Sequence, residues 1–244
     1  MNEDKNKLEL PAWLNQIAVF DTETTGLNLK ESRIITAALH VINANGEVLP
    51  HGKDWVLNPG IPIPEESSKV HGFYDKDVAN AQDASSGVAE MVSAIQELFS
   101  QGIPVLAYNA SYDFTILHYE ALRHGIQPVQ FGAVIDPLVI DKTVDKYRKG
   151  KRTLVSVAER YNVPLLNAHT AADDAIAAGH VGYAILRYFL GLDKPVVPFP
   201  NSLSELHELQ VKWADEIEAS YAAWRQQDMP SYRPAFGWPV KRLD

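Results

Sequence analysis

The sequence contains no cysteine. The chain therefore cannot form a disulfide, use a thiolate nucleophile or bind zinc through thiolates. Any metal ion must be held by oxygen ligands or by imidazole, and oxygen ligands favour hard cations such as Mg²⁺. The lack of cysteine thus narrows the metal chemistry before any motif is considered.

Long apolar runs are also absent. No stretch approaches the ~20 apolar residues that a membrane-spanning helix needs. The first residues, MNEDKNKLELPAW, are charged where a signal peptide would be apolar. These features predict a cytoplasmic protein with no membrane partner. With 244 residues, the chain is long enough for one good-sized domain with extended ends.

Positive charge is scarce. The chain has 22 Lys and Arg residues against 31 Asp and Glu residues, which gives a formal net charge of −9 at pH 7. A bulk electrostatic attraction to nucleic acid is therefore not expected, although a local basic patch can still bind it. One such patch is KTVDKYRKGKR, residues 142–152, where six cations accompany one acid. It could follow the backbone of a nucleic acid, or it could be an ordinary solvated charge run.

Hydrophobic periodicity predicts an α/β fold. The apolar residues 17–20 indicate a buried strand, and residues 33–57 an antiparallel hairpin around the turn dipeptide Asn45-Gly46. Further strands are expected within 103–109 and 133–136. Helices are expected over 85–102, with Ser85 or Ser86 as the N-cap, and over 111–125, 153–163 and the segment after residue 169. This order predicts a mixed sheet, an antiparallel β-meander followed by parallel strands, flanked by helices.

The C-terminal part has a different composition. Residues 191–203 are rich in proline and predict a linker, and apolar residues then recur at helical spacing from Leu206 to Trp224. The expected organisation is an N-terminal extension (1–15), a main domain (16–190), this linker, and a C-terminal helix and tail (204–244).

Two acids lie at the end of the first expected strand. Asp21 and Glu23 are two positions apart, so in a strand both carboxylates point to the same side. Neighbouring carboxylates raise each other's pKa unless a cation lies between them. Such pairs also occur by chance in surface strands, but here an apolar run precedes the pair, and Gly26 after it permits close approach of a ligand. The pair is a candidate metal site.

The stretch HTAADDA places two adjacent aspartates at the start of a helix. With Thr170 as the N-cap, Asp173 is the third helical residue, where its carboxylate can reach back to the cap and favours the positive end of the helix. Asp174 shares a helical stripe with Ala178 and Val181, which is expected to be buried. A buried carboxylate is costly unless a positive group pairs with it. We therefore predict a capping role for Asp173 and a site role for Asp174.

Two further candidates stay open on the residues alone. Asp113 lies in the first turn of the helix expected over 111–125, where it could simply favour the helix dipole or could join a site with Asp21. His169 is about 140° away from Asp174 in helical phase, so it belongs to the preceding loop. A loop histidine can take up a proton near neutral pH, or it can be an ordinary loop residue.

Three motifs together resemble those of a known enzyme family. FDTETTGL (residues 20–27), AYNASYDFTIL (107–117) and HTAADDA (169–175) are similar, in order and spacing, to the motifs of the DEDDh 3′→5′ exonucleases. This group includes the epsilon proofreading subunit of bacterial DNA polymerase III, ribonuclease T and oligoribonuclease. The resemblance extends from residue 17 to about residue 190 and implies a ribonuclease-H-like fold, in agreement with the expected order of elements.

The resemblance assigns roles to the acidic residues. It implies that Asp21, Glu23, Asp113 and Asp174 bind two Mg²⁺ or Mn²⁺ ions and that His169 is the general base. Two such ions make a water nucleophilic and stabilise the leaving oxyanion of a phosphodiester. In this scheme Asp21 bridges the ions, Glu23 and Asp174 complete one site, and Asp113 binds the other ion, partly through water.

The resemblance also implies contacts with the substrate. Thr25, Gly26 and Leu27 are expected to line the terminal nucleotide, and Tyr108 and Asn109 to contact the substrate. Tyr108 departs from the family, in which many members have histidine before the Asn-Ala pair.

Three functional hypotheses follow. The first is a 3′→5′ exonuclease of proofreading or repair type that acts on nucleic acid with a free 3′ end, chiefly single-stranded DNA. The second keeps the same site but makes RNA ends or short oligonucleotides the substrate, because the sequence does not show how the pocket treats a 2′-hydroxyl. The third makes the chain chiefly an interaction subunit that docks on a DNA polymerase or clamp through its C-terminal helix and tail.

Overall fold

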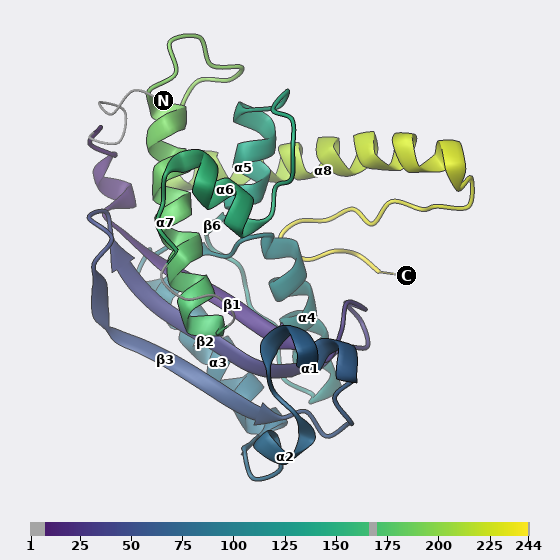
Figure 1. Ribbon diagram of the computed structural model, residues 1–244. Coiled ribbons are helices and arrows are strands. Elements are labelled where there is room, and N and C mark those ends of the chain that lie inside the picture. Colours follow the sequence, from purple (N-terminus) through teal and green to yellow (C-terminus); the bar gives the residue numbers. More distant parts are fainter. Residues whose placement is uncertain (1–7, 166–169, 244) are drawn as a thin grey trace.

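The computed structural model describes residues 8–165 and 170–243. Its centre is a six-stranded sheet with the order β4-β3-β2-β1-β5-β6 (Figure 1). The strands β1 (Gln16–Thr24), β2 (Ile34–Asn43) and β3 (Val48–Asn58) form an antiparallel meander. The short strands β5 (Val105–Leu106) and β6 (Val134–Ile135) continue the sheet in parallel with β1, and β4 (Gln82–Asp83) pairs in parallel with β3. The expected mixed sheet is confirmed.

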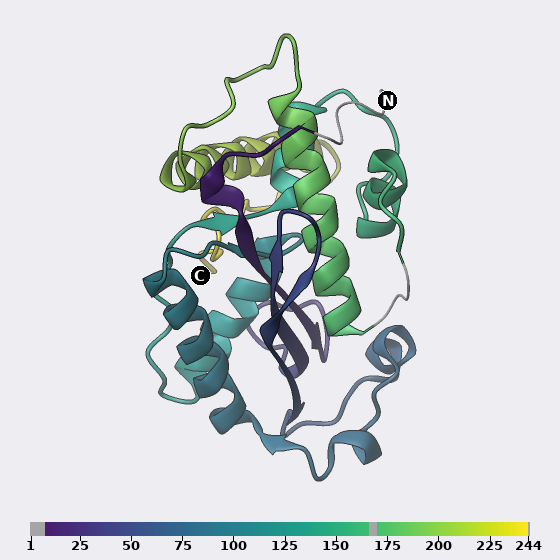
Figure 2. The ribbon, with the colours of Figure 1, turned by 90° about the vertical axis from the view of Figure 1, so that its left-hand side faces the viewer.

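Helices flank both faces of the sheet. In Figure 2 the helix α7 (Ala171–Leu190) covers one face, and α3 (Ala84–Ser100) and α4 (Ala110–Arg123) cover the other. The helix α6 (Leu154–Tyr161) packs beside α7, and α8 (Leu203–Asp228) packs against α5 (Pro137–Val144) and β6. Four short elements were not predicted from the hydrophobic periodicity, because each spans few helical turns. They are α5, α1 (Glu65–His71), α2 (Asp75–Val78) and the 3₁₀ turn η2 (Ala12–Leu14).

Two local expectations have different outcomes. The turn after β2 contains Asn45-Gly46 as expected, and Gly46 has a φ of 86°, which glycine adopts without strain. The expected N-cap of α3 at Ser85 or Ser86 is wrong. The carboxylate of Asp83 accepts the N–H of Ser86 at 3.0 Å and starts the helix earlier. Aspartate and serine are comparable N-caps, so a segment that contains both does not fix the first residue.

Small residues let α7 lie close to the sheet. A Cβ atom added at Gly179 would come within 2.5 Å of Val19 Cγ1 on β1 and within 2.4 Å of Ile42 Cδ1 on β2. The neighbouring Ala175 and Ala178 are fully buried at the same contact. The start of α7 is thereby held against β1, which is the strand that carries Asp21 and Glu23.

Gly179→Ala is therefore expected to destabilise the protein. In an exposed helix this exchange stabilises by about 0.5–1 kcal/mol, because alanine is the better helix former. Here the added methyl group meets the stiff side chain of Val19 and overpacks the contact, at a cost of about 1–3 kcal/mol. Urea unfolding of the wild-type protein and of Gly179→Ala measures whether the exchange lowers or raises the free energy of unfolding. Equal or greater stability of the variant would show that α7 does not lie this close to the sheet.

The C-terminal segment packs on its own domain. In α8, Leu206 and Gln210 are fully buried, and the Gln210 amide accepts the N–H of Asp136 at 2.6 Å and donates to Val134 O at 3.0 Å. The tail then returns along α8 (Figure 1), where the indole of Trp238 lies 5.1 Å from the His207 ring. These contacts favour the interpretation that the C-terminal helix and tail stabilise their own domain, over the hypothesis that they dock on a partner.

Deletion of residues 201–244 is accordingly expected to unfold the protein. It would remove the buried Leu206, Trp213 and Trp238 and leave the backbone of β6 without its Gln210 partner. Loss of a cooperative thermal transition, followed by circular dichroism, is the expected result. A folded, active truncation that had lost only a binding partner would instead support the docking hypothesis.

Within residues 8–165 and 170–243, no helix is both long and apolar enough to cross a membrane.

Candidate active site

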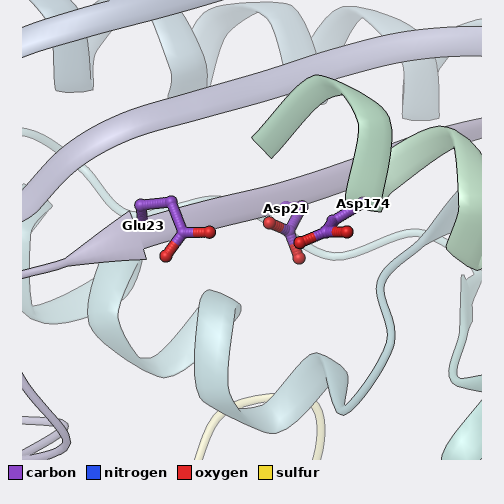
Figure 3. A group of neighbouring side chains, drawn as sticks. All are labelled: Asp21, Glu23 and Asp174. Atoms are coloured by element: carbon purple, nitrogen blue, oxygen red, sulfur yellow. The ribbon is translucent and has the colours of Figure 1, made fainter. Parts of the chain in front are cut away.

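Three carboxylates meet where β1 and the start of α7 come together. Asp21, Glu23 and Asp174 each offer an oxygen, and these oxygens lie within 4.8 Å of one another. Figure 3 shows Asp174 of α7 beside Asp21 of β1, with Glu23 further along the same strand. The structure thus brings together three of the four acids that the sequence singles out.

The alternation of β1 explains which acids share this cluster. Val19 faces α7, whereas the next residue, Phe20, stacks on Phe114 of α4 at 5.6 Å between ring centroids. Asp21 and Glu23 follow Val19 in steps of two, so they lie on the α7 face of the sheet. This is the geometry that the spacing of the two acids predicts.

The adjacent aspartates of α7 divide as the helical phase predicts. The Thr170 hydroxyl accepts the N–H of Asp173 at 3.1 Å and donates to Asp173 Oδ2 at 2.9 Å, which makes Asp173 part of the N-terminal cap. Asp174 instead lies above the stripe of Ala178 and Val181, both fully buried. One position in the sequence therefore separates a capping carboxylate from one in the cluster.

Asp113 reaches β1 from the opposite face of the sheet. Its carboxylate is buried and accepts both the backbone N–H of Thr22 at 3.1 Å and the Thr22 hydroxyl at 2.8 Å. Thr22 lies between Asp21 and Glu23, so Asp113 is held directly beside the cluster without belonging to the group of three. Its negative charge nevertheless acts on the cluster, because it helps to raise the pKa of Asp21.

Burial and mutual repulsion raise the pKa values of these acids. Burial is the main reason that the pKa of Asp21 lies well above its ordinary value, and the charges of Asp113, Glu23 and Asp174 add to it. Burial, with the charge of Asp174, raises the pKa of Glu23 to about 7. Burial likewise raises the pKa of Asp113 to about 7, against the lowering effect of the hydrogen bonds from Thr22.

This donor set fits divalent cations. Crowded, partly buried carboxylates are unfavourable as bare anions, and a positive ion between them removes both the repulsion and the tendency to take up protons. All the donors are carboxylate oxygens, which are the ligands that Mg²⁺ and Mn²⁺ prefer.

The loop after β1 is held firmly beside the cluster. The Thr25 hydroxyl accepts the N–H of Arg33 at 2.9 Å, and the Gly26 carbonyl accepts the Tyr112 hydroxyl at 2.9 Å. Ser67 of α1 donates to the Thr25 carbonyl at 2.9 Å. At the tip of this loop Leu27 is 86% exposed. The loop therefore presents an apolar side chain to solvent from a rigid support.

The other two expected substrate contacts lie after β5. The Tyr108 hydroxyl donates to the carbonyl of Arg152 at 2.6 Å, so it is directed to the basic loop. Asn109 is exposed, has a φ of 67° and donates its N–H to Asp136 Oδ1 at 3.1 Å. The expected general base, His169, lies outside the described residues.

Comparisons with known proteins identify the family of the domain that carries this cluster. A family model described as an exonuclease matches residues 18–181, which include most of β1, all of α4 and the first part of α7. The chain belongs to this exonuclease family. The resemblance indicated by the three motifs is thereby confirmed.

Individual relatives of this exonuclease domain are distant. The DNA polymerase III PolC-type protein of Pediococcus pentosaceus is 25% identical over 182 residues, which are 75% of this chain and 12% of that protein. A DNA polymerase III subunit epsilon-like protein of Rhodobacter capsulatus is 31% identical over 176 residues, 69% of this chain and 23% of that protein. The chain thus spans about an eighth to a quarter of these relatives.

A solved structure supports the fold. E. coli exonuclease I in complex with a dA16 oligonucleotide has a TM-score of 0.59 and 14% sequence identity, over 71% of this chain and 40% of that one.

The sequence patterns did not single out two residues that support the site. Asp136 caps α5 by accepting the N–H of Leu138 at 2.9 Å, and it also accepts the N–H of Ala110 at 3.0 Å, which fixes the start of α4. The dipeptide Asp136-Pro137 after an apolar strand is a helix-start signal that could have revealed it. Tyr112, whose hydroxyl binds the Gly26 carbonyl, lies inside the motif at residues 107–117, but nothing there distinguishes it from its neighbours.

Proposed function

We propose that the chain is a metal-dependent 3′→5′ exonuclease that removes nucleotides from single-stranded DNA. The observation that carries this proposal is the convergence of Asp21, Glu23 and Asp174 within 4.8 Å, with Asp113 fixed beside them, inside the segment that matches the exonuclease family. Membership of the family supplies the reaction class, and the carboxylate cluster supplies a means to perform it.

Each acid has a part in this proposal. Asp21, Glu23 and Asp174 would hold the cations, and Asp113, oriented by Thr22, would complete the set from the other face of the sheet. When bound, two divalent ions supply Lewis acidity for the attacking water and for the leaving oxygen. The rigid Thr25-Gly26 loop would place the terminal nucleotide, and the exposed Leu27 would contact its base.

His169 is proposed as the general base. It immediately precedes Thr170, the N-cap of the helix that brings Asp174 into the cluster. The imidazole pKa is suited to accepting the proton of a water near neutral pH. His169→Gln is expected to lower kcat while leaving oligonucleotide affinity nearly unchanged.

DNA is proposed over RNA as the substrate. The named relatives are DNA polymerase III proteins, and the solved structure that supports the fold contains a DNA oligonucleotide. A DNA polymerase is the partner class that these relatives suggest.

The test is hydrolysis of one oligonucleotide sequence prepared as DNA and as RNA. With 5′-labelled DNA and Mg²⁺, shortening in single-nucleotide steps is expected, whereas 3′-labelled DNA should release labelled mononucleotide at once. Chelation of Mg²⁺ by EDTA should stop both. Faster turnover of the RNA would assign the site to RNA ends, and endonucleolytic fragments or metal-independent cleavage would refute the mechanism.

A further inference from the structure

The loop between α5 and α6, residues 145–153, contains cations of two kinds. Arg148 and Arg152 have side chains that are 11% and 13% exposed, and both form ion pairs with the fully buried carboxylate of Asp141. Arg160 of α6 pairs with Asp145 at 3.2 Å. The guanidinium groups of these arginines are therefore paired with acids of the protein itself.

The arginines also fix the path of the loop backbone. Arg152 donates to the carbonyl of Asp145 at 2.6 Å, and Arg148 donates to the carbonyl of Lys151 at 3.2 Å. Tyr161 closes the network from α6 by donating to Asp141 at 2.9 Å. A loop with this many internal contacts presents its remaining side chains in a defined arrangement.

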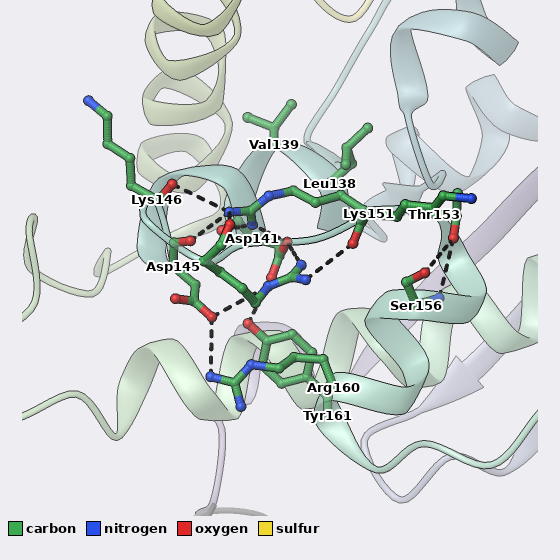
Figure 4. Close-up of polar contacts among 12 residues, drawn as sticks. Leu138, Val139, Asp141, Asp145, Lys146, Lys151, Thr153, Ser156, Arg160 and Tyr161 are labelled. Atoms are coloured by element: carbon green, nitrogen blue, oxygen red, sulfur yellow. Dashed lines mark hydrogen bonds and ion pairs between the residues drawn. The ribbon is translucent and has the colours of Figure 1, made fainter.

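The remaining side chains point outward. Lys146, Lys149 and Lys151 are exposed, and within the described residues none of their ammonium groups forms a hydrogen bond or ion pair. Figure 4 shows the Lys146 side chain extending away from the ion pairs. Tyr147, between these lysines, is 88% exposed. A solvated charge run needs no such aromatic residue, and exposed lysines around an aromatic ring are the elements of a single-strand binding surface.

The loop is anchored just after β5, the strand that pairs with β1. Tyr108 binds the carbonyl of Arg152 at 2.6 Å. Leu106 of β5 pairs with Val19 of β1, so Tyr108 follows this pair by two residues, as Asp21 does on β1. The Tyr108 side chain therefore connects the segment after β5, the strand that pairs with β1, to the end of the basic loop.

We propose that this loop binds the nucleotides that precede the 3′ end of a single strand, with Lys146, Lys149 and Lys151 on the phosphates and Tyr147 stacked on a base. This proposal rests on the proposed function, because the strand bound by the loop is the one whose 3′ end would lie at the carboxylates. It also explains how a chain with a net charge of −9 holds a polyanion: the contact is local.

The test compares a fluorescein-labelled dT20 oligonucleotide with a dinucleotide. Binding of dT20 is measured by fluorescence anisotropy in Ca²⁺ at several salt concentrations, and hydrolysis of the dinucleotide in Mg²⁺. The triple variant K146A/K149A/K151A is expected to bind dT20 at least about tenfold more weakly at low salt and to reduce the slope of log K against log salt by about 2. Tyr147→Ala is expected to weaken dT20 binding by about fivefold or more with little change in slope. Hydrolysis of the dinucleotide should be unchanged in both variants.

The control is K53A/K194A/K212A, which removes the same charge from exposed positions outside the loop. It should bind dT20 nearly as the wild-type protein does. If the loop variants and this control bind dT20 equally, the proposal is wrong. If the wild-type protein hydrolyses neither substrate, the proposed function fails, while dT20 binding and its salt slope still decide the role of the loop.

Discussion

Replacement of Asp174 by alanine is expected to reduce the rate of single-stranded DNA hydrolysis by about 1000-fold or more. Asp174 is the only carboxylate that α7 contributes to the group of three, so its loss removes the ligand that the helix would supply to the proposed metal site. Metal ions contribute several kcal/mol to the stabilisation of charge in the transition state, and each ~1.4 kcal/mol is a factor of ten in rate. Single-turnover hydrolysis of 5′-labelled DNA with saturating Mg²⁺ measures the loss.

Asp173→Ala is the matched control, because it removes the same group one position earlier. Its carboxylate binds Thr170 at the helix cap, so the variant should lose about 0.5–1 kcal/mol of stability. Its hydrolysis rate should stay within a few-fold of the wild-type rate. If Asp173→Ala were inactive and Asp174→Ala active, the proposed roles of the two aspartates would be wrong, and Asp173 would belong to the site in place of Asp174.

Asp21→Asn is expected to abolish hydrolysis and at the same time to stabilise the metal-free protein at pH 8. Burial and three neighbouring carboxylates raise the pKa of Asp21 above that of the unfolded chain. A carboxyl group whose pKa is raised on folding contributes its stability fully below the unfolded pKa and loses it as pH rises through the folded pKa. At pH 8, above the pKa of about 7 of both Glu23 and Asp113, the metal-free cluster is therefore at its least stable.

Thermal unfolding in EDTA measures this effect. Relief of repulsion equivalent to about one pKa unit is ~1.4 kcal/mol, and for a chain of this size such a change raises Tm by about 3–6 °C. Mg²⁺ should raise the Tm of the wild-type protein more at pH 8 than at pH 6, since at pH 6 it must displace protons, and should have little effect on Asp21→Asn. The exposed Asp193 provides a control, because Asp193→Asn should keep the wild-type response to Mg²⁺. A lower Tm of Asp21→Asn in EDTA at pH 8 would show that its neighbouring carboxylates do not destabilise Asp21.

Regular local patterns predicted much of the fold and the arrangement of the carboxylates. The two-residue spacing of Asp21 and Glu23 fixed their common face, and the helical phase of α7 separated Asp173 from Asp174. Both features depend only on periodicity within one element. The hairpin of β2 and β3 was likewise signalled by its Asn45-Gly46 turn.

Features that depend on contacts between distant segments could not be predicted in this way. The approach of Asp113 to Thr22 joins residues 91 positions apart across the sheet. In the basic loop the arginines are buried and the lysines exposed. This difference depends on Asp141 of α5, which forms ion pairs with both Arg148 and Arg152. Nothing in a list of charges shows which of them are neutralised inside the protein.

Whether the three carboxylates hold a metal ion is decided by the position of Mn²⁺ in crystals of the protein, located by anomalous diffraction. If these acids bind divalent cations, a strong anomalous peak is expected among the carboxylates of Asp21, Glu23 and Asp174 in the wild-type protein, and no such peak in Asp174→Ala. A peak at another site, or a cluster that stays free of Mn²⁺ at concentrations that support hydrolysis, would contradict it.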